Sequence, residues 1–218
     1  ERFYGKPQDY CFLGLLPAYL ERQGSSLVYM AHHLIKRSGH PKSGFYLYNY
    51  GALADTIHQL EQAKQPTILL GVSFALWDLA EQYPMSLKST TVMETGGMKG
   101  KRKEVIREEL HGIYQTAFEV ENIHSEYGMT ELLSQAYSKG NGIFYCPPWM
   151  RVMAREVTDP FNIVSLNRTG ILNIIDLANI HSCAFLATSD LGKCFEDGSF
   201  EVLGRMDESD IRGCNLLV

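Results

Sequence analysis

The chain has 218 residues, of which 45% are hydrophobic and 21% are charged, so one large core or two coupled subdomains are expected. Its formal net charge of -5 gives no electrostatic reason to expect a nucleic-acid partner. No uncharged apolar run approaches the roughly 20 residues that span a bilayer, so no membrane span is expected.

The cysteines and the first residues predict the cellular compartment. The five cysteines include no C-x-x-C pair, and their odd number argues against a disulfide framework as well as a zinc site. Glu1–Gly5 has neither the apolar core nor the cleavage site of a signal peptide. We therefore expect a cytoplasmic protein with reduced thiols. Because the first residue is not methionine, we also expect residues upstream of it.

The first part of the chain alternates between apolar, β-forming runs and longer segments with helical periodicity. In chain order we expect a strand at Phe12–Leu16, helices at Ser25–Ile35 and Leu53–Gln62, a strand at Thr67–Val72, a helix at Phe74–Gln82, a strand at Thr90–Glu94 and an amphipathic helix at Lys103–Phe118. Strands that alternate with helices predict an α/β fold with a doubly wound sheet, here over residues 1–142.

The pattern changes after Gly142. Ile143–Val157 and Ile171–Leu203 contain short apolar segments separated by Gly, Asp, Asn and Pro, which predicts a smaller antiparallel β subdomain over residues 143–203. Asp197-Gly198 is a hairpin-turn signal between two of these segments. Residues 204–218 are interpreted as a hinge-like motif followed by a C-terminal tail.

Three polar stretches follow expected strands, where ligands of open α/β sheets bind. The first, ETGGMKG at 94–100, contains Thr95 and the pair Gly96-Gly97, which permits close approach of a flat or anionic ligand. Taken alone, this stretch is more simply interpreted as a plain turn that leads into the next helix.

The second stretch is SEYGMTELL at 125–133, interpreted as strand, turn and helix. Tyr127 offers a ring for stacking, Gly128 permits a tight turn, and Thr130 lies where a helix N-terminus favours a phosphate. Glu131 is placed to hold a hard cation that bridges the phosphate. The alternative is that Thr130 and Glu131 are a simple capping pair.

The third stretch is TSDLG at 188–192. An aspartate just past a strand, here Asp190, can accept two hydrogen bonds from a ribose diol. An Asx-turn is the alternative interpretation.

Taken together, the order of these stretches resembles the core motifs of adenylate-forming enzymes. The motifs are YGMTE at 127–131, TSDLG at 188–192 and G-R-x-D-x-x-x-x-R-G at 204–213. Four stretches are similar to the acyl-protein synthetase family, the long-chain-fatty-acid–luciferin-component ligases of bacterial luminescence and their relatives: 16–22, 25–30, 94–100 and 125–137. The resemblance runs through essentially the whole chain.

The resemblance implies a role for each motif residue. Tyr127 would stack on adenine beside the Gly96-Gly97 loop, within a nucleotide site that includes Thr95, Glu126, Gly128 and Met129. Thr130 would contact the α-phosphate of ATP or AMP, and Glu131 would bind magnesium. Asp190 would hold the ribose hydroxyls, Arg205 would contact ribose and phosphate, and Asp207 would mark a hinge.

The resemblance also predicts a two-step reaction. An acid, fatty or other, and ATP would give an acyl-adenylate, and the acyl group would pass to a cysteine near the C-terminus, here Cys214. A partner acyl-protein reductase would then act on the thioester. A thiolate is a strong nucleophile, but Cys214 beside Leu216–Val218 is explained as well by burial in an apolar strand.

Two family features are absent from this sequence: the Gly/Ser/Thr-rich phosphate loop before Tyr10 and the large C-terminal domain. We therefore expect an N-terminally truncated fragment that is inactive or weak alone. Two alternatives are an acyl-CoA ligase of the phenylacetate-CoA ligase type and a nucleotide-binding module without activity.

Overall fold

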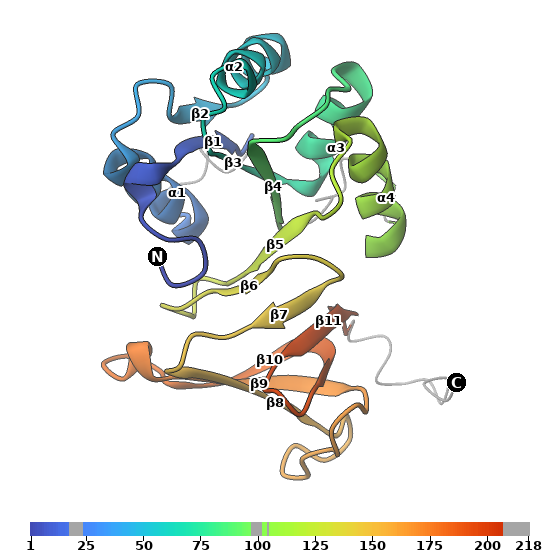
Figure 1. Cartoon of the computed structure of the whole chain (residues 1–218). Coiled ribbons are helices and arrows are strands. Elements are labelled where there is room, and N and C mark those ends of the chain that lie inside the picture. Colours follow the sequence, from blue (N-terminus) through green and yellow to red (C-terminus); the bar gives the residue numbers. More distant parts are fainter. Residues whose placement is uncertain (18–23, 97–101, 104, 207–218) are drawn as a thin grey trace. The chain divides into compact units, whose positions relative to one another are not determined.

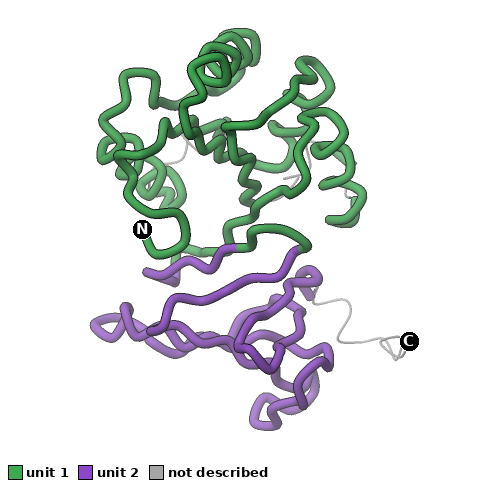
Figure 2. The backbone as a smooth tube through the Cα atoms, viewed as in Figure 1, with its two compact units in different colours: residues 1–130, 138–141 green, residues 131–137, 142–218 purple. Residues whose placement is uncertain are grey.

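A computed structural model describes residues 1–17, 24–96, 102–103 and 105–206 of the chain. The chain divides into two compact units (Figure 2). The first unit comprises residues 1–130 and 138–141, and the second comprises residues 131–137 and 142–218.

The first unit is built on a parallel sheet (Figure 1). Its strands are β1 (Cys11–Leu15), β2 (Gly44–Tyr46), β3 (Thr67–Val72), β4 (Thr90–Thr95) and β5 (His124–Tyr127), in the spatial order β2-β1-β3-β4-β5. Every residue of β1 and of β3 is buried, which indicates that both faces of the sheet are covered here. The predicted α/β fold class is confirmed.

In the described part of the chain, four α-helices connect these strands, and each lies where the periodicity predicts one. They are α1 (Ser26–Ser38), α2 (Tyr50–Gln62), α3 (Ser73–Gln82) and α4 (Arg107–Phe118), preceded by the short 3-10 helix η1 (Pro7–Asp9). Local chemistry sets several of their ends. Ser25 and Asn49 cap α1 and α2 by accepting main-chain hydrogen bonds, and Gly39, with a φ of 64°, ends α1 in the left-handed region.

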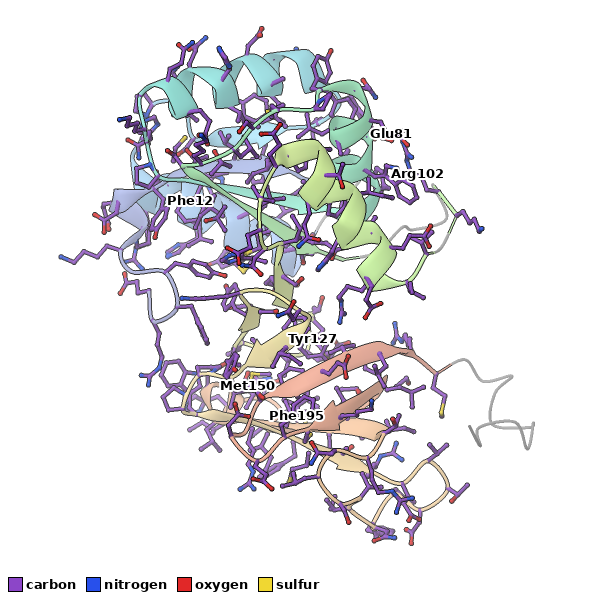
Figure 3. The ribbon with its side chains drawn as sticks, turned by 45° about the vertical axis from the view of Figure 1, so that its right-hand side comes forward. Phe12, Glu81, Arg102, Tyr127, Met150 and Phe195 are labelled. Carbon is purple, nitrogen blue, oxygen red and sulfur yellow. The ribbon has the colours of Figure 1, made fainter. Side chains whose placement is uncertain are left out.

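The predicted start of α4 is wrong. The helix begins at Arg107 rather than Lys103, and the preceding Ile106 is extended, with 68% of its surface exposed. Arg102 explains part of the difference because its guanidinium donates to Asp78 and Glu81 of α3 (Figure 3). It also lies 4.7 Å from the ring centre of Trp77. These contacts hold the chain at α3 before α4 begins.

The second unit is an antiparallel β structure. Its strands are β7 (Ile143–Tyr145), β8 (Met150–Arg155), β9 (Gly170–Asp176), β10 (Phe185–Cys194) and β11 (Phe200–Arg205), in the order β7-β11-β10-β9-β8. The 3-10 helix η2 (Leu177–Asn179) follows β9, and the residues of β6 (Ala136–Ser138) are divided between the two units.

The hairpin predicted at Asp197-Gly198 is confirmed. Gly198 has a φ of 81°, and the main-chain N–H of Phe195 donates to Ser199 across the turn at 2.9 Å. Among the described residues, no helix is long and apolar enough to cross a membrane.

Candidate functional site

The carboxyl ends of the parallel strands form the edge where the candidate site of the first unit lies. Strand β1 has β2 on one side and β3 on the other, so the connections that follow β1 and β2 leave in opposite directions. Ligands of open α/β sheets bind at such a reversal, outside the carboxyl ends of the strands. Two of the three predicted stretches, after β4 and after β5, begin at this edge.

Thr95 and Glu126 pair at this edge. The strand register places Glu94 opposite Ser125, so the next residues, Thr95 and Glu126, are neighbours as well. The Thr95 hydroxyl donates to Glu126 Oε2 at 2.5 Å. Burial raises the pKa of Glu126 to about 7, and the hydrogen bond from Thr95 partly opposes the rise. A carboxyl at the sheet edge therefore changes protonation close to neutral pH.

Replacing Glu126 by glutamine is expected to flatten the pH dependence of stability. The carboxyl binds its proton more tightly in the folded protein, where its pKa is about 7, than at its ordinary pKa of 4.5. Its contribution to stability is therefore complete at low pH and is lost as the pH rises through about 7. Urea midpoints at about pH 5 and about pH 8 measure the effect. The wild-type midpoint should fall more than that of Glu126→Gln, and equal falls would contradict the assignment.

A network of buried, hydrogen-bonded side chains lies at the carboxyl end of β4. Ser73, at the start of α3, donates to Glu94 Oε1 at 2.6 Å, and His111 Nε2 of α4 lies 2.8 Å from Glu94 Oε2. The Tyr114 hydroxyl donates to the Ser73 carbonyl at 2.7 Å. These four side chains are all buried. Because buried polar groups are costly unless paired, this network fixes β4 immediately before Gly96, whose φ is 75°.

The stretch after β5 turns instead of entering the predicted helix. Residues 128–135 contain turns and bends and lead into β6, so the helix expected after Thr130 is wrong. The main-chain N–H groups of Leu133 and Ser134 donate to the Asp176 carboxylate, which draws this segment to the end of β9. Tyr127 and Met129 are half-buried, whereas Gly128 and Thr130 are exposed.

A helix N-terminus does approach Thr130, but it belongs to α1. The Ser26 and Thr130 hydroxyl oxygens lie 3.3 Å apart, and Ser26 is the first residue of α1. The first turn of an α-helix favours an anion, because its N–H groups have no partner within the helix. Thr130 therefore does lie near a helix N-terminus that favours a phosphate. That helix is α1, however, and not a helix that follows Thr130 in the sequence.

Glu131 begins the second unit with an exposed side chain. Its main-chain carbonyl accepts a hydrogen bond from Asn179 Nδ2 at 2.8 Å, and within the described residues its carboxylate has no hydrogen bond or ion pair. The described part of the chain holds no cluster of three or more metal-ligating side chains. A free carboxylate without further protein ligands suits magnesium, which binds through one or two carboxylates together with substrate phosphates.

Asp190 and Arg205 lie opposite each other in the second unit. Their Cα atoms are register partners on β10 and β11. The prediction that Asp190 follows a strand is wrong, because it lies inside β10 where the pairing with β9 shifts between Ala187 and Leu191. Such a bulge bends the strand and changes the direction of the side chains next to it. Thr188 Oγ1 accepts from the Asp190 N–H at 3.0 Å.

Three predicted site residues, Gly97, Asp207 and Cys214, lie outside the described residues. Among the other cysteines, Cys11 and Cys194 are buried, Cys146 is half-buried and Cys183 is exposed. Burial raises the pKa of Cys146 to about 12. Cys146 is therefore a poor source of thiolate at neutral pH.

No protein-family model matches the chain, and no curated protein matches it. Solved structures do match. ATP-bound MatB from Rhodopseudomonas palustris aligns at 16% identity and a TM-score of 0.63, over 92% of this chain and 41% of MatB. O-succinylbenzoate coenzyme A synthetase from Bacillus subtilis, with ATP and magnesium, aligns at 18% identity and a TM-score of 0.58, over 94% of this chain and 43% of the synthetase.

Amide bond synthetase McbA from Marinactinospora thermotolerans is a third match, at 15% identity and a TM-score of 0.57, over 92% of this chain and 42% of McbA. The chain therefore shares the fold of the aligned parts of these three enzymes. It spans about two fifths of the length of each matched structure.

Several residues around the candidate site were not singled out from the sequence. They are Ser26, Ser73, His111, Asp176 and Asn179. The position of Ser26 just after the Ser25 cap was a usable signal, since an anion-binding helix start needs such a residue. The only local bond of the Asp176 side chain among the described residues is the cap to the Ala178 N–H, and its partners Leu133 and Ser134 lie more than 40 residues earlier.

Proposed function

We propose that this chain is the nucleotide-binding part of an enzyme that activates a carboxylic acid with ATP. The substrate carboxylate attacks the α-phosphorus, the bond from that phosphorus to the bridging oxygen breaks, and pyrophosphate leaves with its electron pair. The product is an acyl-adenylate. The observation that carries the proposal is the position of Tyr127, the last residue of β5, and of Thr130 after it, at the edge of the parallel sheet where ligands of open α/β folds bind.

In the first unit, the proposed nucleotide contacts begin with Tyr127. Its ring stacks on adenine beside Gly96, with Glu126 and Thr95 behind it. Met129 and Gly128 complete this stretch, and Gly128 permits the turn. The Thr130 hydroxyl binds the α-phosphate. The start of α1, which approaches Thr130 through Ser26, adds N–H groups that favour the charge developing there.

In the second unit, Asp190 accepts hydrogen bonds from the ribose hydroxyls, and Arg205 contacts ribose and phosphate. The register pairing of their strands supports a joint role, because it places the two residues opposite each other. Glu131 holds magnesium, which supplies positive charge to the phosphate oxygens. The Glu131 side chain is exposed, and its carboxylate has no hydrogen bond or ion pair within the described residues, which supports this assignment.

The acyl group then passes to a thiol within the same protein. The Cys214 thiolate attacks the acyl carbonyl, the carbon–oxygen bond to AMP breaks, and AMP leaves, so that a thioester remains for a reductase subunit. Fatty acids are the substrates that the resemblance favours. Transfer to coenzyme A is the second candidate, supported by the shared fold with O-succinylbenzoate coenzyme A synthetase.

Pyrophosphate exchange with a panel of carboxylic acids tests the proposal. The full-length protein that contains this chain should return labelled pyrophosphate to ATP only when its acid is present. Absence of exchange with every fatty and aromatic acid would overturn the proposal. Acyl label that hydroxylamine removes from the protein would support transfer to a cysteine, whereas consumption of coenzyme A would support the second candidate.

Replacing Asp190 by alanine should weaken AMP binding by about 1–3 kcal/mol, because hydrogen bonds from the ribose to a charged acceptor are lost. That loss is roughly a fivefold to 150-fold rise in Kd by calorimetry on this chain. Asp197→Ala is the matched control, since Asp197 lies in the turn of the same hairpin and accepts hydrogen bonds from Ser199. An unchanged Kd for Asp190→Ala would remove Asp190 from the nucleotide site.

A further inference from the structure

The carboxylate of Asp176 is fully buried at the end of β9. It accepts four hydrogen bonds: from the N–H groups of Leu133 and Ser134 at 3.0 and 2.9 Å, from the Ser134 hydroxyl at 2.7 Å, and from the Ala178 N–H at 3.1 Å. A buried charge persists only when it is paired or fully hydrogen-bonded. Asp176 therefore ties residues 133–134 to the start of η2.

Asn179 extends the same arrangement to Glu131. Its buried amide donates to the Glu131 carbonyl at 2.8 Å and to the Cys183 carbonyl at 3.0 Å. Trp149 adds a further brace because its indole N–H donates to the Ser134 hydroxyl at 2.9 Å. The segment from Glu131 to Ser134 has no regular secondary structure and is held by the side chains of Trp149, Asp176 and Asn179.

Two properties of Glu131 connect these hydrogen bonds to a function. Its main chain is fixed by Asn179, yet its side chain is exposed and, within the described residues, makes no hydrogen bond or ion pair. A ligand to a cation works best when its backbone is rigid and its carboxylate is free, because groups behind a metal ligand orient it. An unbraced turn would leave this carboxylate spread over many positions.

We propose that Asn179, anchored beside Asp176, is a positioning residue that orients Glu131 toward the divalent cation of the bound nucleotide. The proposal rests on the assignment of Glu131 as the magnesium ligand in the proposed function. Asn179 touches neither the cation nor the nucleotide in this arrangement. It acts through the Glu131 carbonyl.

The test measures cation binding directly, with Mn²⁺ in place of Mg²⁺ and electron paramagnetic resonance of the free ion, on the full-length protein in the presence of ATP. Asn179→Ala should weaken Mn²⁺ binding by about tenfold or more, the usual effect of losing a group behind a metal ligand. Asn173→Ala is the matched control. It removes an amide oxygen on β9 that accepts a hydrogen bond from Arg155 of β8, and it should leave Mn²⁺ affinity unchanged.

The double variant Asn179→Ala with Glu131→Gln separates positioning from simple loss of structure. If Asn179 acts through Glu131, the double variant should bind Mn²⁺ no more weakly than Glu131→Gln alone. Additive losses, or wild-type binding by Asn179→Ala, would overturn the inference and leave the proposed function standing. Wild-type binding by Glu131→Gln would overturn the metal assignment and the inference with it. If the alanine variant does not fold, Mn²⁺ binding is compared with Asn179→Ser in its place, which keeps one hydrogen-bond donor.

Discussion

Replacing Asp176 by alanine should lower the free energy of unfolding by about 3 kcal/mol or more. The change leaves four donors without their acceptor in a fully buried place, and each unpaired buried group costs about 1–3 kcal/mol. Relief of the carboxylate from burial offsets part of that cost. The loss should fall on the second unit, where all of these groups lie.

Urea unfolding followed by Trp149 fluorescence measures this loss, because Trp149 lies in the second unit and donates to Ser134. A Trp77→Phe background leaves Trp149 as the single tryptophan of the two in the chain. Asp159→Ala is the matched control: Asp159 is exposed, and its carboxylate accepts a hydrogen bond from the Phe161 N–H. A midpoint shift for Asp176→Ala no larger than that of the control would contradict the prediction.

Replacing Cys214 by serine should abolish the acyl-protein product while leaving adenylate formation intact. A serine hydroxyl is far less ionised than a thiol at neutral pH, so it does not attack the mixed anhydride at a comparable rate. The full-length variant should retain pyrophosphate exchange and lose the acyl label that hydroxylamine releases.

Cys183→Ser is the matched control for this experiment. Cys183 has an exposed thiol, so it tests whether any accessible cysteine accepts the acyl group. The control should keep both exchange and label. Label that survives in Cys214→Ser, or disappears in Cys183→Ser, would assign the acceptor to another residue and end the proposal for Cys214.

The sequence alone determined the regular elements that depend on local chemistry. The strand expected at Thr67–Val72 has those bounds in the structure, because a continuous run of β-forming, apolar residues suits a strand buried on both faces. The hairpin at Asp197-Gly198 follows in the same way, since glycine adopts the positive φ that the turn needs. Ser25 and Gly39 mark the ends of α1.

The environment of the candidate site was decided by tertiary structure. Three local expectations failed: the helix after Thr130, the helix start at Lys103 and the position of Asp190 just past a strand. In the first two, a distant partner competes with the local preference. Asp176 takes the N–H groups of Leu133 and Ser134, and α3 holds Arg102. At Asp190, two extra residues of β10 are accommodated as a bulge against β9.

Motif residues could thus be named from their order, whereas their chemistry depends on neighbours far away in the chain. Glu126 has a pKa of about 7 because folding buries it beside Thr95, 31 residues earlier. The anion-favouring helix start near Thr130 comes from Ser26, 104 residues earlier. Hydrophobic periodicity and turn chemistry act over a few residues and are visible in sequence. Desolvation and hydrogen-bond partnership arise only when strand order and register bring distant residues together.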